Sequence, residues 1–471
     1  MIKFPVRPAA LAFVASLFAS AVAAPPMLGQ EQPSAVEIDV PYERFELPNG
    51  LTVILHEDHA TPVVSVNVYY HVGSGSEKPG RTGFAHLFEH IMFEGSEHVP
   101  EGAFDEWLEA AGGINNGSTN PDRTNYWENI PSNAVELAVF LESDRMGYLL
   151  GAMSPEKVDG QRDVVKNERR QSYENRPYGM AWLTMNKHLF PPEHPYNWPT
   201  IGSMEDLSAA SYEDVVEFFQ IYYGPGNASL VIAGDIDMEE TRAMVTKWFS
   251  DVPSGEPVPP IDPPVAQLVA EERLLLEDRV QLPRLYMCWL TPARYTPGDA
   301  ELDLLSDILS GGKNSRLYKR LVYDMQIAQD VSAFQRSRTL GSSYCIVATA
   351  REGHDLAELE TVIQEELDRV KSEPPTDREV QRAVNQFEAT FLRRLESVGG
   401  FGGKADGLNA YFTYTGNHDY FNEDLGRYRT VSGKDLQSVV LSFLRDDARV
   451  ILSVVPEGRT DLAAVPLPKT E

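Results

Sequence analysis

Two histidines and a glutamate in one short stretch of the chain could bind a metal ion and use it. The segment GFAHLFEHIMFEGS, residues 83–96, contains His86, Glu89 and His90 among apolar residues that recur at helical spacing. At 3.6 residues per turn, His86 and His90 lie one turn apart on one face of a helix. Two imidazoles at this spacing can share one tetrahedral Zn²⁺. Glu89 projects from nearly the same face and could take a proton from a water held by the metal without being a ligand.

A hydrolytic zinc site needs a third protein ligand, which must come from elsewhere in the chain. The segment SPEKVDGQRDVVKNERRQSYENRP, residues 154–177, is predicted to be a helix that starts after Ser154. It offers Glu156, Glu168 and Glu174, and periodicity alone does not choose among them. The alternative without a metal is an amphipathic helix with polar residues on its solvent face.

A closed, structural zinc site is a further alternative, and it would need a fourth protein ligand. His56, His59 and His71 lie in or beside the first predicted strands and are expected to be exposed. His98 follows the motif and is expected in a loop. No fourth ligand is evident from the sequence, so an open, catalytic site is favoured.

The element pattern predicts two α+β domains of one fold. Residues 254–267, SGEPVPPIDPPVAQ, read as an extended linker because they contain five prolines. We therefore predict an N-terminal metal-binding domain at 40–253 and a homologous C-terminal domain at 268–460. Residues 24–39 are predicted to be a disordered linker, and 461–471 a tail.

The two predicted domains resemble each other in sequence pattern, which indicates an internal duplication. Ser211 and Ser432 each open a Ser-x-x-Asp helix start followed by an apolar helix and a β-branched strand. Aligning HLFEHIMFEG with DLLSDILSGG places Asp303, Ser306 and Asp307 where the first domain has its histidines and glutamate. The second domain is thus predicted to lack metal ligands.

The composition and the first residues bear on where the chain works. Residues 1–23 combine a basic start, a short apolar run and a small-x-small end, which is typical of a secretory signal peptide. Export, most simply to a bacterial periplasm, is therefore expected, with no membrane insertion after the signal is removed. The formal net charge of −29 argues against nucleic-acid binding. Cys288 and Cys345 could pair or stay as free thiols.

The chain resembles the pitrilysin or insulinase family of zinc metallopeptidases, whose inverted motif His-x-x-Glu-His matches residues 86–90. The segment VVKNERRQ resembles the family's third-ligand segment and selects Glu168. The resemblance implies one Zn²⁺ per chain, held by His86, His90 and Glu168, with Glu89 as the catalytic base. It also implies half-units made of two homologous α+β sandwich domains, which agrees with the duplication and the linker.

Two further segments resemble family elements. GGINNGSTNPDRTNYW, residues 112–127, resembles the strand whose edge pairs with the peptide substrate. Asn116 falls on the family's Asn, and Gly117 stands where the family usually has Ala. SRLYKRL resembles the start of the helix that follows the glycine-rich turn of the second domain.

The chain departs from the family pattern at two places. Gln161 stands one heptad before Glu168, where some members carry a second glutamate that supports the site. Val322 and Gln329 stand where active members carry an arginine and a tyrosine that grip the substrate from the opposite half of the chamber. This predicts a second, homologous chain that supplies the Arg/Tyr pair.

The resemblance thus implies an exported zinc endopeptidase that cleaves peptides or unfolded segments in a clam-like chamber. We expect this chain to be the metal-bearing subunit of a heterodimer, with a homodimer as the main alternative. A non-catalytic partner subunit of the same fold is the rival function. The substrate, the cleavage preference and the identity of the partner are not predicted by the sequence.

Overall fold

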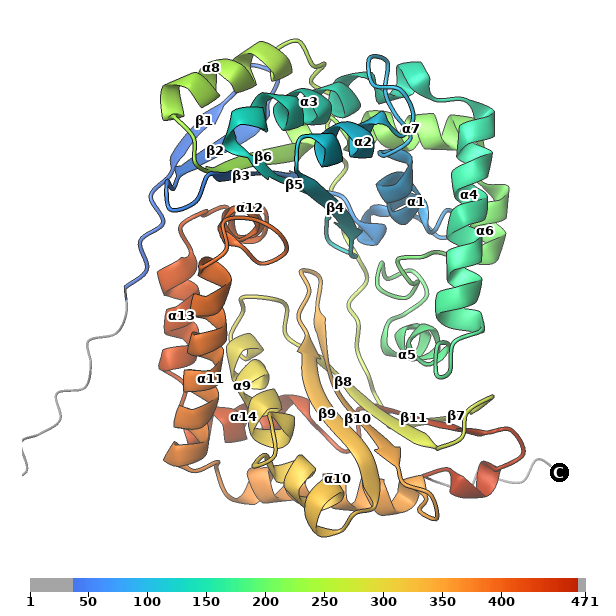
Figure 1. Ribbon diagram of the computed structural model, residues 1–471. Coiled ribbons are helices and arrows are strands. Elements are labelled where there is room, and N and C mark those ends of the chain that lie inside the picture. The colour runs from blue at the N-terminus through green and yellow to red at the C-terminus, as the bar shows by residue number, and fades with distance from the viewer. Residues whose placement is uncertain (1–36, 465–471) are drawn as a thin grey trace, which may run out of the picture. The chain divides into compact units, whose positions relative to one another are not determined.

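The computed structural model describes residues 37–464. The predicted signal peptide, most of the segment after it and the end of the predicted tail lie outside these residues. Two sheets organise the described chain, each packed by helices (Figure 1). None of the helices in residues 37–464 is long and apolar enough to cross a membrane.

The first sheet has six strands in the order β1-β2-β6-β3-β5-β4. All pairs are antiparallel except β2 with β6. The strands are β1 (Glu43–Glu46), β2 (Thr52–Glu57), β3 (Val63–Tyr70), β4 (Ile114–Thr119), β5 (Thr124–Pro131) and β6 (Ala228–Gly234).

The second sheet has five strands in the order β7-β11-β8-β10-β9. Again only one pair, β7 with β11, is parallel. The strands are β7 (Glu272–Asp278), β8 (Arg284–Thr291), β9 (Ala328–Arg336), β10 (Ser342–Ala350) and β11 (Val450–Pro456). Apart from β1, the two sheets have the same order and the same strand directions, which confirms the predicted duplication of an α+β fold.

In the first half, helices lie where the sequence predicts them after Gly83, Ser154 and Ser211, and a π-helical turn follows the second of these. The helices of this half are α1 (Phe84–Ile91), α2 (Ala103–Ala110), α3 (Val135–Ala152), α4 (Pro155–Arg169), α5 (Ala181–Leu189), α6 (Met204–Ala209), α7 (Tyr212–Tyr222) and α8 (Met238–Phe249). Short turns are η1 (Ser74–Ser76), η2 (Ser132–Ala134), η3 (Arg170–Glu174) and η4 (Pro225–Asn227). Ser211 caps α7 in a reciprocal capping box, as its sequence predicts.

The second half has fewer helices around its sheet within the described residues. Its helices are α9 (Asp299–Ser310), α10 (Leu356–Ser372), α11 (Asp377–Leu395), α12 (Lys404–Thr415), α13 (Phe421–Arg429) and α14 (Gly433–Phe443), with the turns η5 (Tyr318–Asp324) and η6 (Thr460–Leu462). Ser432 caps α14 in a second capping box. The predicted linker, residues 254–267, contains no helix or strand.

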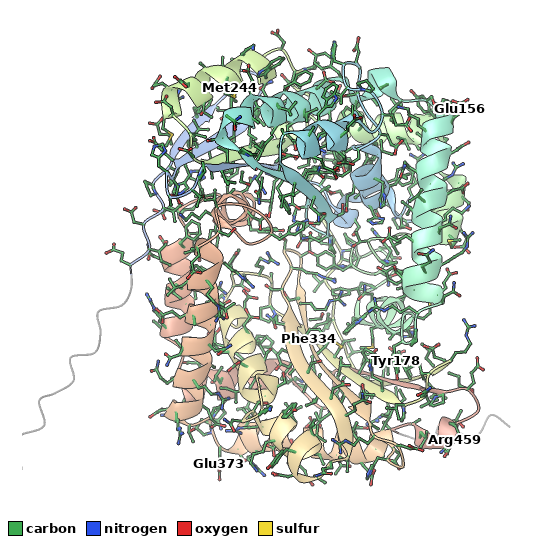
Figure 2. All side chains as sticks on the ribbon, viewed as in Figure 1. Glu156, Tyr178, Met244, Phe334, Glu373 and Arg459 are labelled. Atoms are coloured by element: carbon green, nitrogen blue, oxygen red, sulfur yellow. A yellow bond between two sulfur atoms is a disulfide. The ribbon has the colours of Figure 1, made fainter. Side chains whose placement is uncertain are left out.

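Each sheet is covered on one face by a helix from the other half. Helix α5 packs its apolar side on β8 and β11 of the second sheet, in a cluster that includes Met185, Leu189 and Leu452. Tyr178 and Phe334, both labelled in Figure 2, pack against the same cluster. Helix α12 packs in turn on β3 and β6 of the first sheet (Figure 1). Each half therefore contributes one helix that packs on the sheet of the other half, so the two halves do not stand as independent units.

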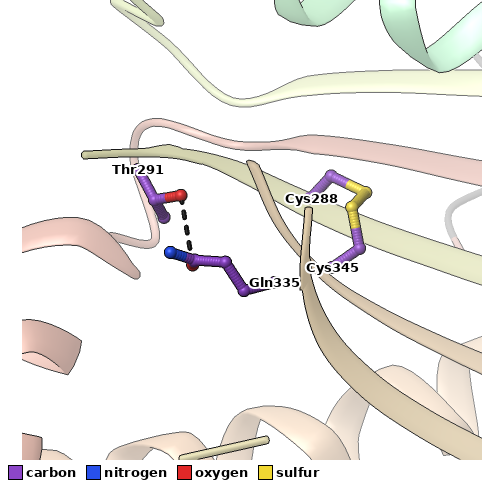
Figure 3. The surroundings of a disulfide bond; sticks show 4 residues. All are labelled: Cys288, Thr291, Gln335 and Cys345. Carbon is purple, nitrogen blue, oxygen red and sulfur yellow. Dashed lines mark hydrogen bonds between the residues drawn. A yellow bond between two sulfur atoms is a disulfide. The ribbon is translucent and has the colours of Figure 1, made fainter. Parts of the chain in front are cut away.

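A disulfide joins the two central antiparallel strands of the second sheet. Cys288 in β8 and Cys345 in β10 lie directly opposite each other in the strand register and form a disulfide (Figure 3). In the same sheet, the hydroxyl of Thr291 at the end of β8 donates a hydrogen bond to the side-chain oxygen of Gln335 in β9, with 3.3 Å between the two oxygens. The structure thus decides between the paired and free states that the sequence left open.

Two of the histidines predicted to be exposed are not: His56 is buried and His71 is half-buried. His56 is 3% exposed, and its Nδ1 lies 2.6 Å from the carbonyl oxygen of Pro41. His71 bonds the Ser229 hydroxyl across the sheet, and burial lowers the pKa of His71 to about 4. The prediction failed because both side chains point to the face that α12 covers, and only long-range packing creates that cover. His59 is exposed and bonds Glu57 and Asp235, as expected for a surface histidine.

Candidate zinc site

Helix α1 holds its two histidines by burying its apolar side. Phe84, Leu87, Phe88 and Ile91 are all buried in the first core, which leaves the opposite side of the helix to His86 and His90. The helix starts at Gly83, whose φ of 93° is in the left-handed region that favours glycine. A side chain there would also meet the carbonyl oxygen of Ile201 at 2.9 Å.

The N-cap residue of α1, Gly83, makes no side-chain capping hydrogen bond. The carboxyl group of Glu77 takes the place of that cap. Glu77 accepts hydrogen bonds from the backbone N–H groups of Gly83 and Ala85, at 3.0 and 2.8 Å. A carboxyl group at this position accepts hydrogen bonds from N–H groups that have no partner within the helix. Burial raises the pKa of Glu77 to about 8. Ala85 directly precedes His86, so Glu77 fixes the backbone next to the first histidine.

Helix α4 brings the third carboxylate to the histidines. Ser154 accepts a hydrogen bond from the N–H of Lys157, and Pro155 occupies the first turn, as the sequence predicts. The helix packs along α1. Glu168 lies near its end, just before the π-helical turn η3. Arg169 anchors this end by donating a hydrogen bond to the carbonyl oxygen of Gly202 at 2.6 Å.

The three side chains converge with the spacing of a metal site. Oε2 of Glu168 lies 3.6 Å from Nε2 of His86 and 3.4 Å from Nε2 of His90. Zinc ligands about 2.1 Å from the metal in a tetrahedron are about 3.4 Å from one another. His86, His90 and Glu168 are also the one group of such residues within 37–464 that could hold a metal. Two imidazoles and a carboxylate therefore fit Zn²⁺ in both chemistry and spacing.

Charges at the cluster favour metal binding over a charged histidine pair. Burial lowers the pKa of His86, which favours the neutral imidazole that binds metals. The hydrogen bond with His90 lowers the pKa of Glu168, which keeps that carboxylate ionised. The matching positions of the second half do not form such a cluster. Asp303 there accepts a hydrogen bond from the Tyr428 hydroxyl at 2.7 Å.

Glu89 lies on the same helix as the two histidines, and its side chain borders strand β4. A Cβ built on Gly117 would lie 3.5 Å from Cγ of Glu89 and 3.0 Å from the Tyr126 ring. Glycine at this position thus leaves space beside Glu89. A cavity of about 310 Å³ opens there, and its walls include Glu89, His90, Asn116 and Gly117.

Strand β4 is the edge of its sheet, so one side of it is free to bind an extended chain. The N–H of Gly117 donates to the side-chain oxygen of Asn116 at 2.8 Å. Asn116 and Gly117 therefore lie together on the edge strand and line the cavity with Glu89.

Gln161 lies on α4, and its side-chain hydrogen bond goes to a residue outside the three converging side chains. Its amide donates to Glu94 at 2.5 Å, and Glu94 lies three residues after the last residue of α1. Gln161 thus ties α4 to the segment after the metal helix. Val322 lies in η5 and Gln329 in β9. These two residues stand in place of the arginine and the tyrosine of the family pattern.

Sequence reasoning missed two residues that shape the site. Glu77 caps α1, and Asp105 on α2 lines the cavity beside Glu89. Neither lies in a recognisable motif. A capping glutamate six residues before the helix looks like any loop carboxylate, and Asp105 looks like one of several polar residues on a solvent-facing helix.

Two family models match successive parts of the chain. The model described as insulinase (peptidase family M16) matches residues 52–186, which contain all three converging side chains and Glu89. The model described as peptidase M16 inactive domain matches residues 209–387. The chain belongs to the peptidase M16 (insulinase) family. The name of the second model agrees with the absence of a metal cluster from the described second half.

Relatives of this M16 chain are named as zinc proteases. Zinc protease PqqE of Helicobacter pylori is 28% identical over 361 residues, which cover 76% of this chain and 80% of the relative. A probable mitochondrial-processing peptidase subunit beta of Arabidopsis thaliana is 23% identical and covers 75% of this chain and 67% of its own. These names support a zinc peptidase-like function.

Solved structures share the fold of this M16 chain. A protease from Helicobacter pylori has a TM-score of 0.83 at 25% identity and covers 88% of this chain and all of its own. The periplasmic protease PqqL from Escherichia coli has a TM-score of 0.74 at 17% identity. This chain matches only 50% of the length of PqqL, so it corresponds to one half of that larger protein.

Proposed function

We propose that this chain is a zinc-dependent endopeptidase that cleaves peptides or unfolded protein segments. The observation that carries the proposal is the convergence of His86, His90 and Glu168 at tetrahedral spacing, with Glu89 beside them on an open cavity. His86, His90 and Glu168 would hold the metal. A purely structural zinc site is not favoured, because it would be closed by a fourth protein ligand.

The chain's own residues supply the proton transfers and the substrate alignment. Zn²⁺, when bound, supplies Lewis-acid chemistry: it polarises a carbonyl group and makes water more acidic. Glu89 takes the proton from the attacking water and passes it to the leaving amine. An extended peptide pairs with the free edge of β4, where its main chain competes with Asn116 for the N–H of Gly117.

The same proposal assigns this chain to a two-part enzyme with a closed chamber. The chain lacks the Arg/Tyr pair at Val322 and Gln329, and it matches half the length of PqqL. A homologous second chain that carries the pair would complete the site as a heterodimer, and a homodimer that works without the pair is the competing arrangement.

An exported location is part of this proposal. The signal-peptide pattern of residues 1–23 supports export, and the disulfide between Cys288 and Cys345 is suited to an oxidising compartment such as a bacterial periplasm. PqqL, which shares the fold, is itself described as periplasmic.

The test is peptide hydrolysis and zinc content measured on the same purified chain and on Glu89→Gln. We expect about one zinc per chain in both proteins, and a loss of more than about 100-fold in kcat for Glu89→Gln. Substantial turnover by Glu89→Gln would rule out its role as the base.

The activity of the chain alone then separates the remaining possibilities. Robust cleavage by the zinc-loaded wild type would mean that the missing Arg/Tyr pair is dispensable. Zinc binding with little cleavage, restored by a homologous subunit, would support the heterodimer. Zinc binding without cleavage in any mixture would favour the rival function, a non-catalytic subunit.

A further inference from the structure

The cavity beside Glu89 is placed to receive one side chain of a bound peptide. Its walls come from the end of the metal helix, from α2 and from β4: Glu89, His90, Phe93, Asp105, Asn115 and Gly117. Because Gly117 lies on the edge strand and Glu89 beside the reacting bond, a residue next to that bond would direct its side chain into this cavity.

Asp105 gives the cavity an anionic wall. It lies in the first turn of α2, next to Phe104, which is buried in the core and fixes the orientation of the helix. The amide of Asn115 on β4 donates to Oδ1 of Asp105 at 2.8 Å, which ties this exposed carboxylate to the strand at the rim of the cavity. Among residues 37–464, no lysine, arginine or histidine forms an ion pair with Asp105.

Phe93 gives the cavity an apolar wall. Its half-buried ring packs edge-on against Phe104, with 5.6 Å between ring centroids, and against Tyr126 at 5.7 Å. An aliphatic chain could lie on this ring while a charged group at its end reaches Asp105. The cavity of about 310 Å³ is large enough for a lysine or arginine side chain.

The net charge of the site also favours a basic side chain in the cavity. With Zn²⁺ bound, its two positive charges are balanced by the carboxylates of Glu168 and Glu89. Asp105 then leaves the cavity with a net negative charge. An acidic side chain would be repelled, and an apolar one would remove water from Asp105 without replacing its hydrogen bonds.

We propose that the cavity formed by Phe93, Asp105 and Asn115 selects a basic side chain, lysine or arginine, next to the bond that is cleaved. Asp105 is the specificity-determining residue. This inference rests on the proposed peptidase function and adds the substrate class to it.

The test compares peptides that differ only by a charge. Two series replace the residue on either side of the cleaved bond by lysine or by norleucine, which has a similar stem without the ammonium group. For the zinc-loaded chain we expect kcat/KM to favour lysine about three- to tenfold at one of the two positions. Asp105→Asn should reduce this ratio to less than about twofold. Glu106→Gln, a charge change on the next, exposed residue of α2 outside the cavity, should keep it.

A binding measurement separates this inference from the proposed function. The affinities of the lysine and norleucine peptides for Glu89→Gln, and for the same variant with Asp105→Asn, are measured by fluorescence anisotropy. A lysine preference that disappears with Asp105→Asn supports the inference even if the chain alone cleaves nothing. Equal affinities for the two peptides, no binding of either, or a lysine preference that survives Asp105→Asn would overturn it.

Discussion

At the scale of single residues, the site depends on one carboxylate that must come from a separate helix. His86 and His90 are fixed on one helix turn, but Glu168 reaches them only because α4 packs along α1. Glu156 lies on the same helix about 18 Å away along its axis. Figure 2 labels it near the start of α4, where it is exposed.

Replacing Glu168 should therefore remove the metal, and replacing Glu156 should not. We expect Glu168→Ala to lower zinc affinity by more than about 100-fold, because even supporting contacts outside the ligand set are worth 10- to 100-fold. Zinc content after dialysis against a weak chelator measures this, with Glu156→Ala as the matched control. A Glu168→Ala protein that keeps a full zinc equivalent would show that another residue is the third ligand.

Some of these residues could be predicted from the sequence and others could not. The spacing of His86, Glu89 and His90 places them on one helix face, because helix periodicity is a local property. Periodicity could not choose among the carboxylates of α4, since it gives the angle around a helix and not the position of a partner along its axis. The resemblance to the family chose Glu168, and the distances in the structure agree with that choice.

At the scale of elements, several helices are tied to their neighbours by charged side chains. Arg316, just before η5, makes a two-pronged ion pair with Glu379 in the first turn of α11, with N–O distances of 2.7 and 2.9 Å. Glu379 also completes the capping box with Thr376. The hydrogen bonds from Arg316 lower the pKa of Glu379 from 4.5 to about 2.

The ion pair of Glu379 should contribute stability that depends on pH. The folded pKa lies below the unfolded value, so the contribution is present above about pH 4.5 and is lost as the pH falls toward 2. Solvent screening limits it to about 1 kcal/mol. We expect Glu379→Gln, which keeps a capping residue, to lower the unfolding free energy by that amount at pH 6–7, by progressively less below about pH 4.5, and by almost nothing at pH 2.

Urea denaturation at several pH values measures this difference between wild type and variant. Glu373→Gln, an exposed neighbour labelled in Figure 2, is the control and should change stability by less than about 0.5 kcal/mol at every pH. A constant deficit of Glu379→Gln across the whole range would contradict the ion-pair explanation.

Element order was predictable from the sequence, and element partners were not. The capped helices at Ser154, Ser211 and Ser432 begin where their cap residues indicate, because a cap is read from three or four neighbouring residues. The exchange of α5 and α12 between the two sheets could not be predicted in this way. It depends on contacts between residues more than a hundred positions apart, and for the same reason the cover that α12 provides over His56 and His71 was missed.

At the scale of the whole molecule, the two exchanged helices dock by different chemistry. Helix α5 covers the second sheet with apolar side chains, including Met185 and Leu189. Helix α12 instead meets a polar sheet face. Asn409, fully buried, donates to the side chain of Asn67 at 2.8 Å and to the backbone oxygen of Ser229 at 3.2 Å, and it accepts a hydrogen bond from the Ser229 hydroxyl. A polar contact of this kind fixes one register, because a displaced helix leaves buried groups unpaired.

Asn409 should therefore control how firmly the second half is held to the first sheet. Asn409→Ala leaves the side-chain oxygen of Asn67 buried without its donor and removes the bond from the Ser229 hydroxyl, which keeps His71 as a partner, at a cost of about 2–3 kcal/mol. If α12 undocks locally, amide hydrogen exchange along Lys404–Thr415 should speed up roughly 30- to 150-fold, while the strands of both sheets change far less. Hydrogen-exchange mass spectrometry measures this.

Asn385→Ala, the same substitution at an exposed site on α11, should leave α12 unchanged. Exchange that rises equally in α12 and in every strand would mean that α12 does not undock separately and that the molecule unfolds as one unit.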